Sequence, residues 1–192
     1  PGGPRLTPIE EPHGLKMRFA YWGMRHWMGK VLTPAKVLYA RVPESMAVLR
    51  AIQKFQAKGL TLDLSLQLLI ADLASQINGC SFCEDIGRAM ASRRKLGLDR
   101  KFDALLNYRT DPIFSARERA ALAYAEEATR NKRVSEETFA ALRQQFSERE
   151  IVEITLVNAL ENLYNLTNLP LGIGSDGLCA LAQTATTRPG SE

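Results

Sequence analysis

Two cysteines, Cys80 and Cys83, directly follow an Asn78-Gly79 pair in the stretch QINGCSFCEDIGRAM. Asn-Gly is typical of a helix end with a left-handed residue, so we expect Cys80 at the start of the next helix. Unpaired backbone N–H groups and the positive end of the helix dipole favour a thiolate there. The C-x-x-C spacing also brings the two sulfurs within bridging distance. The pattern therefore predicts a reversible dithiol–disulfide couple, in which one sulfur attacks and the other resolves.

Two other interpretations of the cysteine pair remain open. Buried cysteines often act as small apolar side chains, so the pair could be inert core. The pair could also be half of a metal site, but the chain has no second C-x-x-C, and its histidines, His13 and His26, lie far off in the N-terminal region. Cys179 is then a single candidate for a third ligand, whereas structural zinc normally needs four. Redox chemistry is the preferred interpretation, and no metal or cofactor is expected.

The composition is that of one globular domain. Of 192 residues, 45% are hydrophobic and 24% charged, which is ordinary for this class. The net charge of +4 is small, and basic side chains are scattered apart from Arg93-Arg94-Lys95, so neither nucleic-acid nor membrane binding is predicted. No apolar run approaches the roughly 18 residues of a membrane span, and the N-terminus lacks the apolar centre of a secretory signal. An odd count of three cysteines, two of them local, favours a cytoplasmic protein.

Helical periodicity accounts for nearly the whole chain between its ends. Ser115 with Glu118 and Ser147 with Glu150 have the spacing of capping boxes, which begin helices. No segment shows the period-two alternation of a strand. The sequence predicts an all-α helical bundle with an aromatic-rich N-terminal helical arm. The expected helices are residues 15–30, 34–41, 43–59, 63–77, 80–96, 99–107, 115–130, 135–146 and 147–166.

The expected organisation is a single domain with two flexible ends. Residues 1–14 contain four prolines and three glycines, which predicts a flexible N-terminal arm. Residues 15–179 form the predicted all-helical domain, and residues 180–192 form a flexible C-terminal tail. Aromatic and methionine side chains crowd the helix that follows the arm. They indicate either packing within the chain or a subunit interface, where such residues are enriched.

Four stretches of the sequence carry a family resemblance: LLIADLASQINGCSFCEDIGRAMA, SARERAALAYAEEAT, SEREIVEITLVNALENLYN and LGIGSDG. Together they resemble the carboxymuconolactone decarboxylase and alkylhydroperoxidase D-like family over residues 38–177. The resemblance implies an all-helical fold that assembles into homo-oligomers. It also implies reduction of organic hydroperoxides, with Cys83 as the attacking thiolate and Cys80 as the resolving thiol. An external dithiol protein or lipoyl group would then reduce the disulfide again, whereas other relatives decarboxylate a lactone without the pair.

The sequence departs from the family motif at two positions. The motif places a glutamate twelve residues before the first cysteine and a histidine four after the second, but this chain has Leu68 and Gly87 there. General-base help is typically worth about 100- to 10,000-fold, so we expect a slow reaction. Gly87 either leaves open space beside Cys83 or lets a neighbouring helix pack closely.

Several charged residues are candidate substitutes for the missing pair. Asp72 lies one turn beyond Leu68 on the same helix face and could be a displaced carboxylate, although a solvated or ion-paired residue is the preferred interpretation. Glu84 and Asp85 fall in the first turn after the cysteines, where acids complement the helix dipole. Arg88 lies off the direct face of the cysteines, so we do not expect it to stabilise a thiolate.

Three further residues have no assigned role. Glu153 and Glu161 lie on the helix of residues 147–166, and either could point inward, although most such glutamates are at the surface. Cys179 follows the stretch LGIGSDG, which we call the exit loop, and does not match the cysteines of the family. A buried or idle thiol is the preferred interpretation for Cys179 over a third redox partner.

The sequence therefore predicts a thiol-dependent antioxidant oxidoreductase with Cys83 and Cys80 as its catalytic residues. Its substrate is an organic hydroperoxide or a small disulfide, its reductant is an external dithiol, and it forms a homo-oligomer. One alternative is a non-catalytic oligomeric helical protein that kept the fold but lost the proton relay. Another is a lactone decarboxylase-like enzyme, for which the sequence offers no convincing acid or base.

Overall fold

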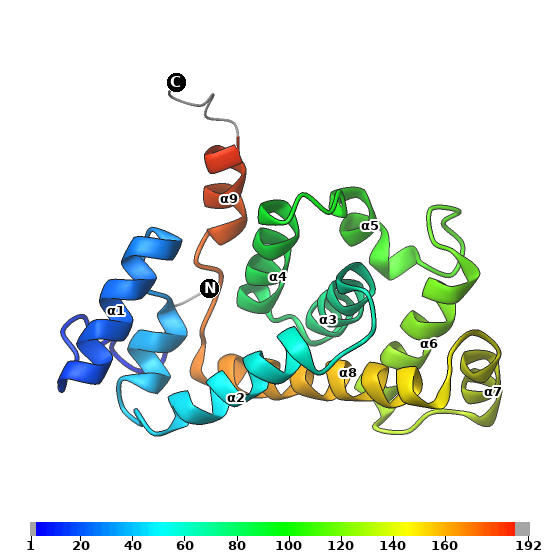
Figure 1. Cartoon of the computed structure of the whole chain (residues 1–192), viewed down its shortest axis with the longest axis horizontal. Helices are drawn as coiled ribbons and strands as arrows, with labels where there is room; N and C mark the ends of the chain where they lie inside the picture. Colours follow the sequence, from blue (N-terminus) through cyan, green and yellow to red (C-terminus); the bar gives the residue numbers. More distant parts are fainter. Residues whose placement is uncertain (1–2, 187–192) are drawn as a thin grey trace.

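The computed structural model describes residues 3–186 of the chain, and the side chains of residues 3–182. Within these residues there are helices and connecting loops but no strand, so the predicted all-α class is confirmed. Figure 1 shows α3 at the centre, with α4 and α6 on either side of it and α8 along the base. The helices are α1 (Leu15–Met28), η1 (Ala35–Tyr39), α2 (Ser45–Lys58), α3 (Leu64–Asn78), α4 (Ser81–Arg93), α5 (Asp99–Ala104), η2 (Leu105–Asn107), α6 (Ala116–Asn131), α7 (Glu136–Gln145), α8 (Glu148–Asn168), η3 (Leu169–Leu171) and α9 (Leu178–Thr186).

Local capping fixes several helix ends where the sequence places them. Both predicted capping boxes form, at the starts of α6 and α8. Gly79 ends α3 with a φ of 75°, the left-handed conformation expected of the Asn-Gly pair. The predicted short helix of residues 34–41 is instead a wider π-type turn, η1.

The central helix α3 packs into two apolar clusters. Leu66 and Ile70 pack into a cluster with residues of α6, α7 and α8. Leu69 and Leu73 pack into a second cluster that includes Phe102 of α5. Each fully buried side chain of this size contributes roughly 1.5–3 kcal/mol, so the position of α3 is well determined. The position of α3 also determines where the turn at Gly79, which directly follows it, lies.

A third apolar cluster surrounds the cysteines and includes the C-terminal helix. Leu178 and Ala182 of α9 are buried in it, together with Ile173 of the preceding loop and Val37 of η1. The helix α9 therefore continues past residue 179, the predicted domain boundary, and extends to Thr186. Residues 1–2 and 187–192 lie outside the described part of the chain.

The predicted N-terminal arm is hydrogen-bonded to the domain. The N–H of Arg5 donates to the carbonyl of Leu171, and that of Ile9 donates to the carbonyl of Lys36. The hydroxyl of Tyr21, a buried residue of α1, donates to the carbonyl of Ile9. The division into arm, domain and tail stays a prediction, and these bonds indicate that residues 5–9 follow one fixed course.

Asp85 of α4 holds the loop between η3 and α9. Its carboxylate accepts hydrogen bonds from the Ser175 hydroxyl at 2.9 Å and from the N–H groups of Asp176, Leu178 and Cys179 at 2.7–3.0 Å. Burial raises the pKa of Asp85, but these four donors outweigh it and hold the pKa below its usual value. The sequence interpretation of Asp85 as a dipole complement to its own helix misses this role.

The Asp176 side chain extends the same attachment to the N-terminal part of the fold. It accepts hydrogen bonds from the N–H and hydroxyl of Thr33, both at 2.7 Å, and pairs with Lys30 at 3.0 Å. The exit loop is therefore fixed to α4 on one side and to the segment between α1 and η1 on the other.

Replacing Asp85 by Ala should lower the free energy of unfolding by about 2–4 kcal/mol, because four donors, one of them on the buried residue Leu178, lose their acceptor. The folded-state pKa of Asp85 is lowered. Its stabilising effect should therefore be present at neutral pH and be lost progressively as the pH falls from about 4 through the lowered folded-state pKa. Urea unfolding at pH 7 and at about pH 2.5 measures both effects. The control is Asp103→Asn at an exposed carboxylate, and equal losses in the two variants would contradict the assignment.

Candidate active site

Cys80 and Cys83 form a disulfide at the start of α4. Cys80 is the N-cap residue, and Cys83 lies in the first turn with a Cα–Cα distance of 5.3 Å between them. The N–H of Cys80 donates to the carbonyl of Ser75 at 2.9 Å, and the N–H of Cys83 donates to the carbonyl of Cys80 at 3.0 Å. The predicted position of the pair at a helix start is confirmed. The turn at Gly79 therefore sets where both sulfurs lie.

The two cysteines differ in exposure and in polar contacts. Cys80 is fully buried, whereas Cys83 retains 6% of its surface. The Asn168 side-chain amide of α8 lies 3.5 Å from the sulfur of Cys83 and donates to it. An amide donor aimed at sulfur stabilises a thiolate more than a thiol, because hydrogen bonding to the charged form favours that form. Cys83 is therefore the sulfur that has both exposed surface and a donor that favours its thiolate.

The two motif positions that lack relay residues have different surroundings. Leu68 is buried in the apolar cluster around Phe102. A Cβ added at Gly87 would meet no atom of the described residues within 4 Å. The interpretation that Gly87 leaves open space is confirmed, and the interpretation that it allows close helix packing is wrong.

Asp72 is a buried, ion-paired carboxylate between α3 and α4. Its Oδ2 accepts from Gln76 at 2.8 Å and lies 3.5 Å from Arg88. Burial raises the pKa of Asp72 to about 6, against the opposing effect of these two donors. Its Oδ1 is buried without a hydrogen-bond partner in the described part of the chain. The interpretation of Asp72 as an ion-paired residue is therefore confirmed, and its interpretation as a solvated residue is wrong.

Arg88 and Glu153, two further candidates from the sequence, bind groups other than the cysteines. Arg88 pairs with Asp72 and with Asp103 of α5 rather than with the cysteines. Glu153 is buried, and its carboxylate accepts from the N–H groups of Thr61 and Leu62, so the surface expectation is wrong for it.

Glu84 and Cys179, two of the remaining candidates, each lie in the first turn of a helix. Glu84 lies in the first turn of α4, and burial raises its pKa. Cys179 is partly buried in the first turn of α9, where Asp85 binds its N–H. No group of three or more potential metal ligands comes together within the described residues.

Glu161 of α8 points inward, which the sequence pattern did not reveal. Its Oε1 accepts from the Ser75 hydroxyl and from the Asn165 amide, both at 2.8 Å. Removal of this carboxyl from water raises its pKa to about 7, and the charge of Asp72 contributes to that rise. A carboxyl group that titrates near neutral pH therefore lies against the last turn of α3, directly before the cysteine turn.

The side chains around Glu161 form a polar row on α8. Glu161, Asn165 and Asn168 are spaced four and three residues apart, which places them on one helix face. The Asn78 amide donates to Asn165 at 2.7 Å and to Asn162 at 3.0 Å. A sequence signal for this row exists, because asparagines recur at helical spacing in NALENLYNLTN. A polar stripe that follows such a period indicates a face that needs hydrogen-bond partners.

The chain resembles known proteins over most of its length. Residues 38–127 match the family model of the carboxymuconolactone decarboxylase family. The uncharacterized protein YnjA of Escherichia coli K12 is 28% identical over 184 residues, which cover 95% of this chain and 98% of YnjA. A crystal structure from Agrobacterium tumefaciens, of a putative antioxidant defence protein AhpD, is 28% identical over 70% of this chain and 93% of its own, with a TM-score of 0.64. An uncharacterized peroxidase-related protein from Silicibacter sp. TM1040 is 25% identical over 90% and 92% of the two chains, with a TM-score of 0.76.

The helical fold is of the alkylhydroperoxidase D-like type, as in these two structures. The chain is similar to the carboxymuconolactone decarboxylase family over residues 38–127, a little under half of its length. The resemblance predicted from the sequence is therefore confirmed. The departures at Leu68 and Gly87 stand.

After reduction, Cys83 should react with iodoacetamide before Cys80, because Cys83 is the more exposed sulfur and has an amide donor. Asn168→Ala removes that donor and should slow alkylation of Cys83 at pH 7 by roughly threefold to tenfold. Mass spectrometry at short reaction times distinguishes the two sites. Asn131→Ala, at the exposed end of α6, is the control, and faster labelling of Cys80 would contradict the assignment.

Proposed function

We propose that this protein is a thiol-dependent oxidoreductase that reduces organic hydroperoxides or small disulfides with its Cys80–Cys83 pair. The observation that carries the proposal is a disulfide at a helix start, with an amide donor aimed at the more exposed sulfur. The antioxidant and peroxidase-related proteins with the same fold support it. An external dithiol in the cytoplasm would return the disulfide to the reduced state.

The proposed peroxidase reaction balances with the two thiols alone. The Cys83 thiolate attacks one oxygen of the hydroperoxide, an S–O bond forms, the O–O bond breaks, and the alcohol leaves with one proton. The Cys80 thiol then attacks the sulfenic acid on Cys83, an S–S bond forms, and water leaves. The external dithiol is oxidised to a disulfide as it reduces the pair. Attack on a small disulfide follows the same route, with a thiol as the leaving group.

The surroundings of Cys83 favour a small substrate. Both cysteines lie in an apolar cluster, and only Cys83 has exposed surface. Gly87, one helical turn further along α4, leaves room on that side. An apolar hydroperoxide would gain from desolvation in this cluster, whereas a charged one would lose hydration.

Hydroperoxide should convert the reduced protein to the Cys80–Cys83 disulfide, and Cys83→Ser should abolish that conversion. The reduced protein is treated with cumene hydroperoxide, and its remaining free thiols are then blocked by alkylation. Mass spectrometry of the peptide that carries Cys80 and Cys83 measures how much of the pair has become a disulfide. Cys179→Ser should retain the wild-type rate, because the reaction uses only the pair. A wild-type protein whose two thiols persist after prolonged exposure would instead support the non-catalytic alternative.

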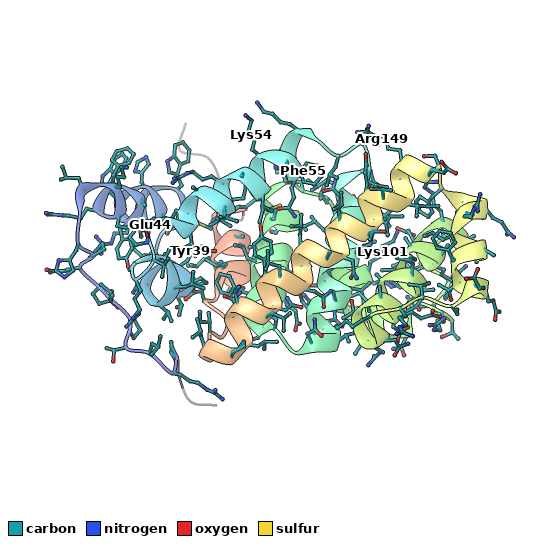
Figure 2. The ribbon with its side chains drawn as sticks, turned by 90° about the horizontal axis from the view of Figure 1, so that it is seen from below. Tyr39, Glu44, Lys54, Phe55, Lys101 and Arg149 are labelled. Atoms are coloured by element: carbon teal, nitrogen blue, oxygen red, sulfur yellow. A yellow bond between two sulfur atoms is a disulfide. The ribbon has the colours of Figure 1, made fainter. Side chains whose placement is uncertain are left out.

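We further propose that the protein is a homo-oligomer that buries the face formed by α2 and α8. In Figure 2 the end of α2 lies near the start of α8, and Phe55 and Arg149 line the groove between these two ends. Only Met46 of α2 is buried within the described chain, although an isolated helix of this length is marginal in water. α8 carries an exposed stripe whose members are spaced four and three residues apart, as in a coiled-coil seam: Val152, Leu156, Ala159, Leu163 and Leu166.

Leu156→Glu with Leu163→Glu should dissociate the oligomer, because charged side chains would have to be buried in the seam. Light scattering after size-exclusion chromatography measures the mass. Arg143→Glu, on the exposed surface of α7, adds a charge elsewhere and should leave the mass unchanged. A wild-type protein with the mass of one chain would refute the assembly.

A further inference from the structure

Reduction of a buried disulfide creates a charge problem. When one sulfur of the pair remains a thiolate, a negative charge appears where the disulfide was neutral. Burial of an unpaired charge is unfavourable, and nearby carboxylates add like-charge repulsion. A neighbouring acid that binds a proton at the same time removes the added charge. The structure offers Glu161 for this purpose.

Ser75 connects Glu161 directly to the cysteine turn. Its hydroxyl donates to Glu161 at 2.8 Å, and its carbonyl accepts from the N–H of Cys80 at 2.9 Å. The Asn165 amide lies 3.3 Å from the same hydroxyl and 2.8 Å from Glu161. One residue, at the last turn of α3, therefore touches both the acid and the resolving cysteine.

α8 supplies the second connection. Asn168, which donates to the sulfur of Cys83, lies two turns after Glu161 on the same face of α8. The acid and the attacking sulfur are thus held by one rigid helix. A change in charge at either position acts on the other through a partly buried region, where electrostatic effects exceed those in water.

Among the charged and titratable groups around Glu161, it is Glu161 whose protonation changes near pH 7. On α3, Asp72 has a pKa raised to about 6 by burial, and it pairs with Arg88 of α4. On α8, burial raises the pKa of Tyr164 to about 12, and on η1 burial also raises that of Tyr39, so both stay neutral. Glu84 of α4 faces Asp72 and pairs electrostatically with Arg88.

We infer that Glu161 takes up a proton when the Cys80–Cys83 disulfide is reduced and releases it when the pair is oxidised again. The inference rests on the proposed function and deepens it. Glu161 does not touch the sulfurs, so it is a positioning residue that acts through Ser75 and Asn165. Glu161 does not occupy the position of either missing motif residue, because Leu68 lies on α3 and Gly87 on α4, whereas Glu161 lies on α8.

The proton and electron balance is complete. An external dithiol gives two electrons to the disulfide and releases two protons; one binds the Cys80 sulfur and the other binds Glu161, while Cys83 stays a thiolate. When Cys83 attacks a hydroperoxide, its negative charge passes to the leaving alkoxide, which takes a proton from water, and Glu161 gives its proton back to water. The Cys80 proton then leaves in the water that forms as the S–S bond closes.

The test is the equilibrium of the full chain with dithiothreitol between about pH 7 and 8, where this reductant is still a dithiol. If Glu161 takes up the second proton, the wild-type equilibrium constant should change by only about twofold over this range, because a carboxyl with a pKa of about 7 is already partly protonated at pH 7. In Glu161→Gln the thiolate forms without a second proton, so the constant should rise about tenfold per pH unit. Glu153→Gln, at a buried glutamate of the same helix, is the matched control and should behave as wild type.

A purely structural role for Glu161 would change stability but not this slope. Ser75→Ala, which keeps Glu161 but removes its contact, should give an intermediate slope. Equal slopes in wild type and Glu161→Gln would overturn the inference, while disulfide formation with hydroperoxide would still support the proposed function. Failure of the wild-type protein to form the disulfide with hydroperoxide would remove the proposed function instead.

Discussion

The left-handed turn at Gly79 determines where everything else in the candidate site lies. The turn allows the N–H of Cys80 to reach back to Ser75 while α4 begins in a new direction. Only a residue without a Cβ adopts this conformation without strain. Because α3 is fixed by two apolar clusters, the turn transfers that rigidity to the two sulfurs. A C-x-x-C on a less constrained helix would have the same chemistry available but no fixed neighbours.

The neighbours of the sulfurs come from distant parts of the chain. α8 contributes an amide and a carboxyl, and the exit loop and α9 contribute the apolar cover that Asp85 holds in place. The polar and apolar sides of the site therefore have separate supports. The polar side is supported by hydrogen bonds between α3 and α8, and the apolar side by one carboxylate that binds four donors.

Local signals in the sequence predicted much of the fold. Capping boxes, the Asn-Gly pair and helical spacing gave the type of nearly every element, since these signals depend on neighbouring residues alone. α9 was missed because its helix is stabilised by contacts with α4 and by Asp85, which lies more than ninety residues away. The orientation of Glu153 and Glu161 was missed for a related reason. Both lie on a helix with apolar residues on more than one face, so periodicity could not distinguish inside from outside.

The empty space at Gly87 has a consequence for which residues this position accepts. A glycine inside a helix usually costs about 0.5–1 kcal/mol relative to alanine, and here no neighbouring atom of the described chain requires it. The first carbon of a side chain at this position would meet no atom of the described residues within 4 Å and would lie one turn from Cys83. Alanine is therefore compatible with the packing around position 87, and the glycine is not needed there to let helices approach each other.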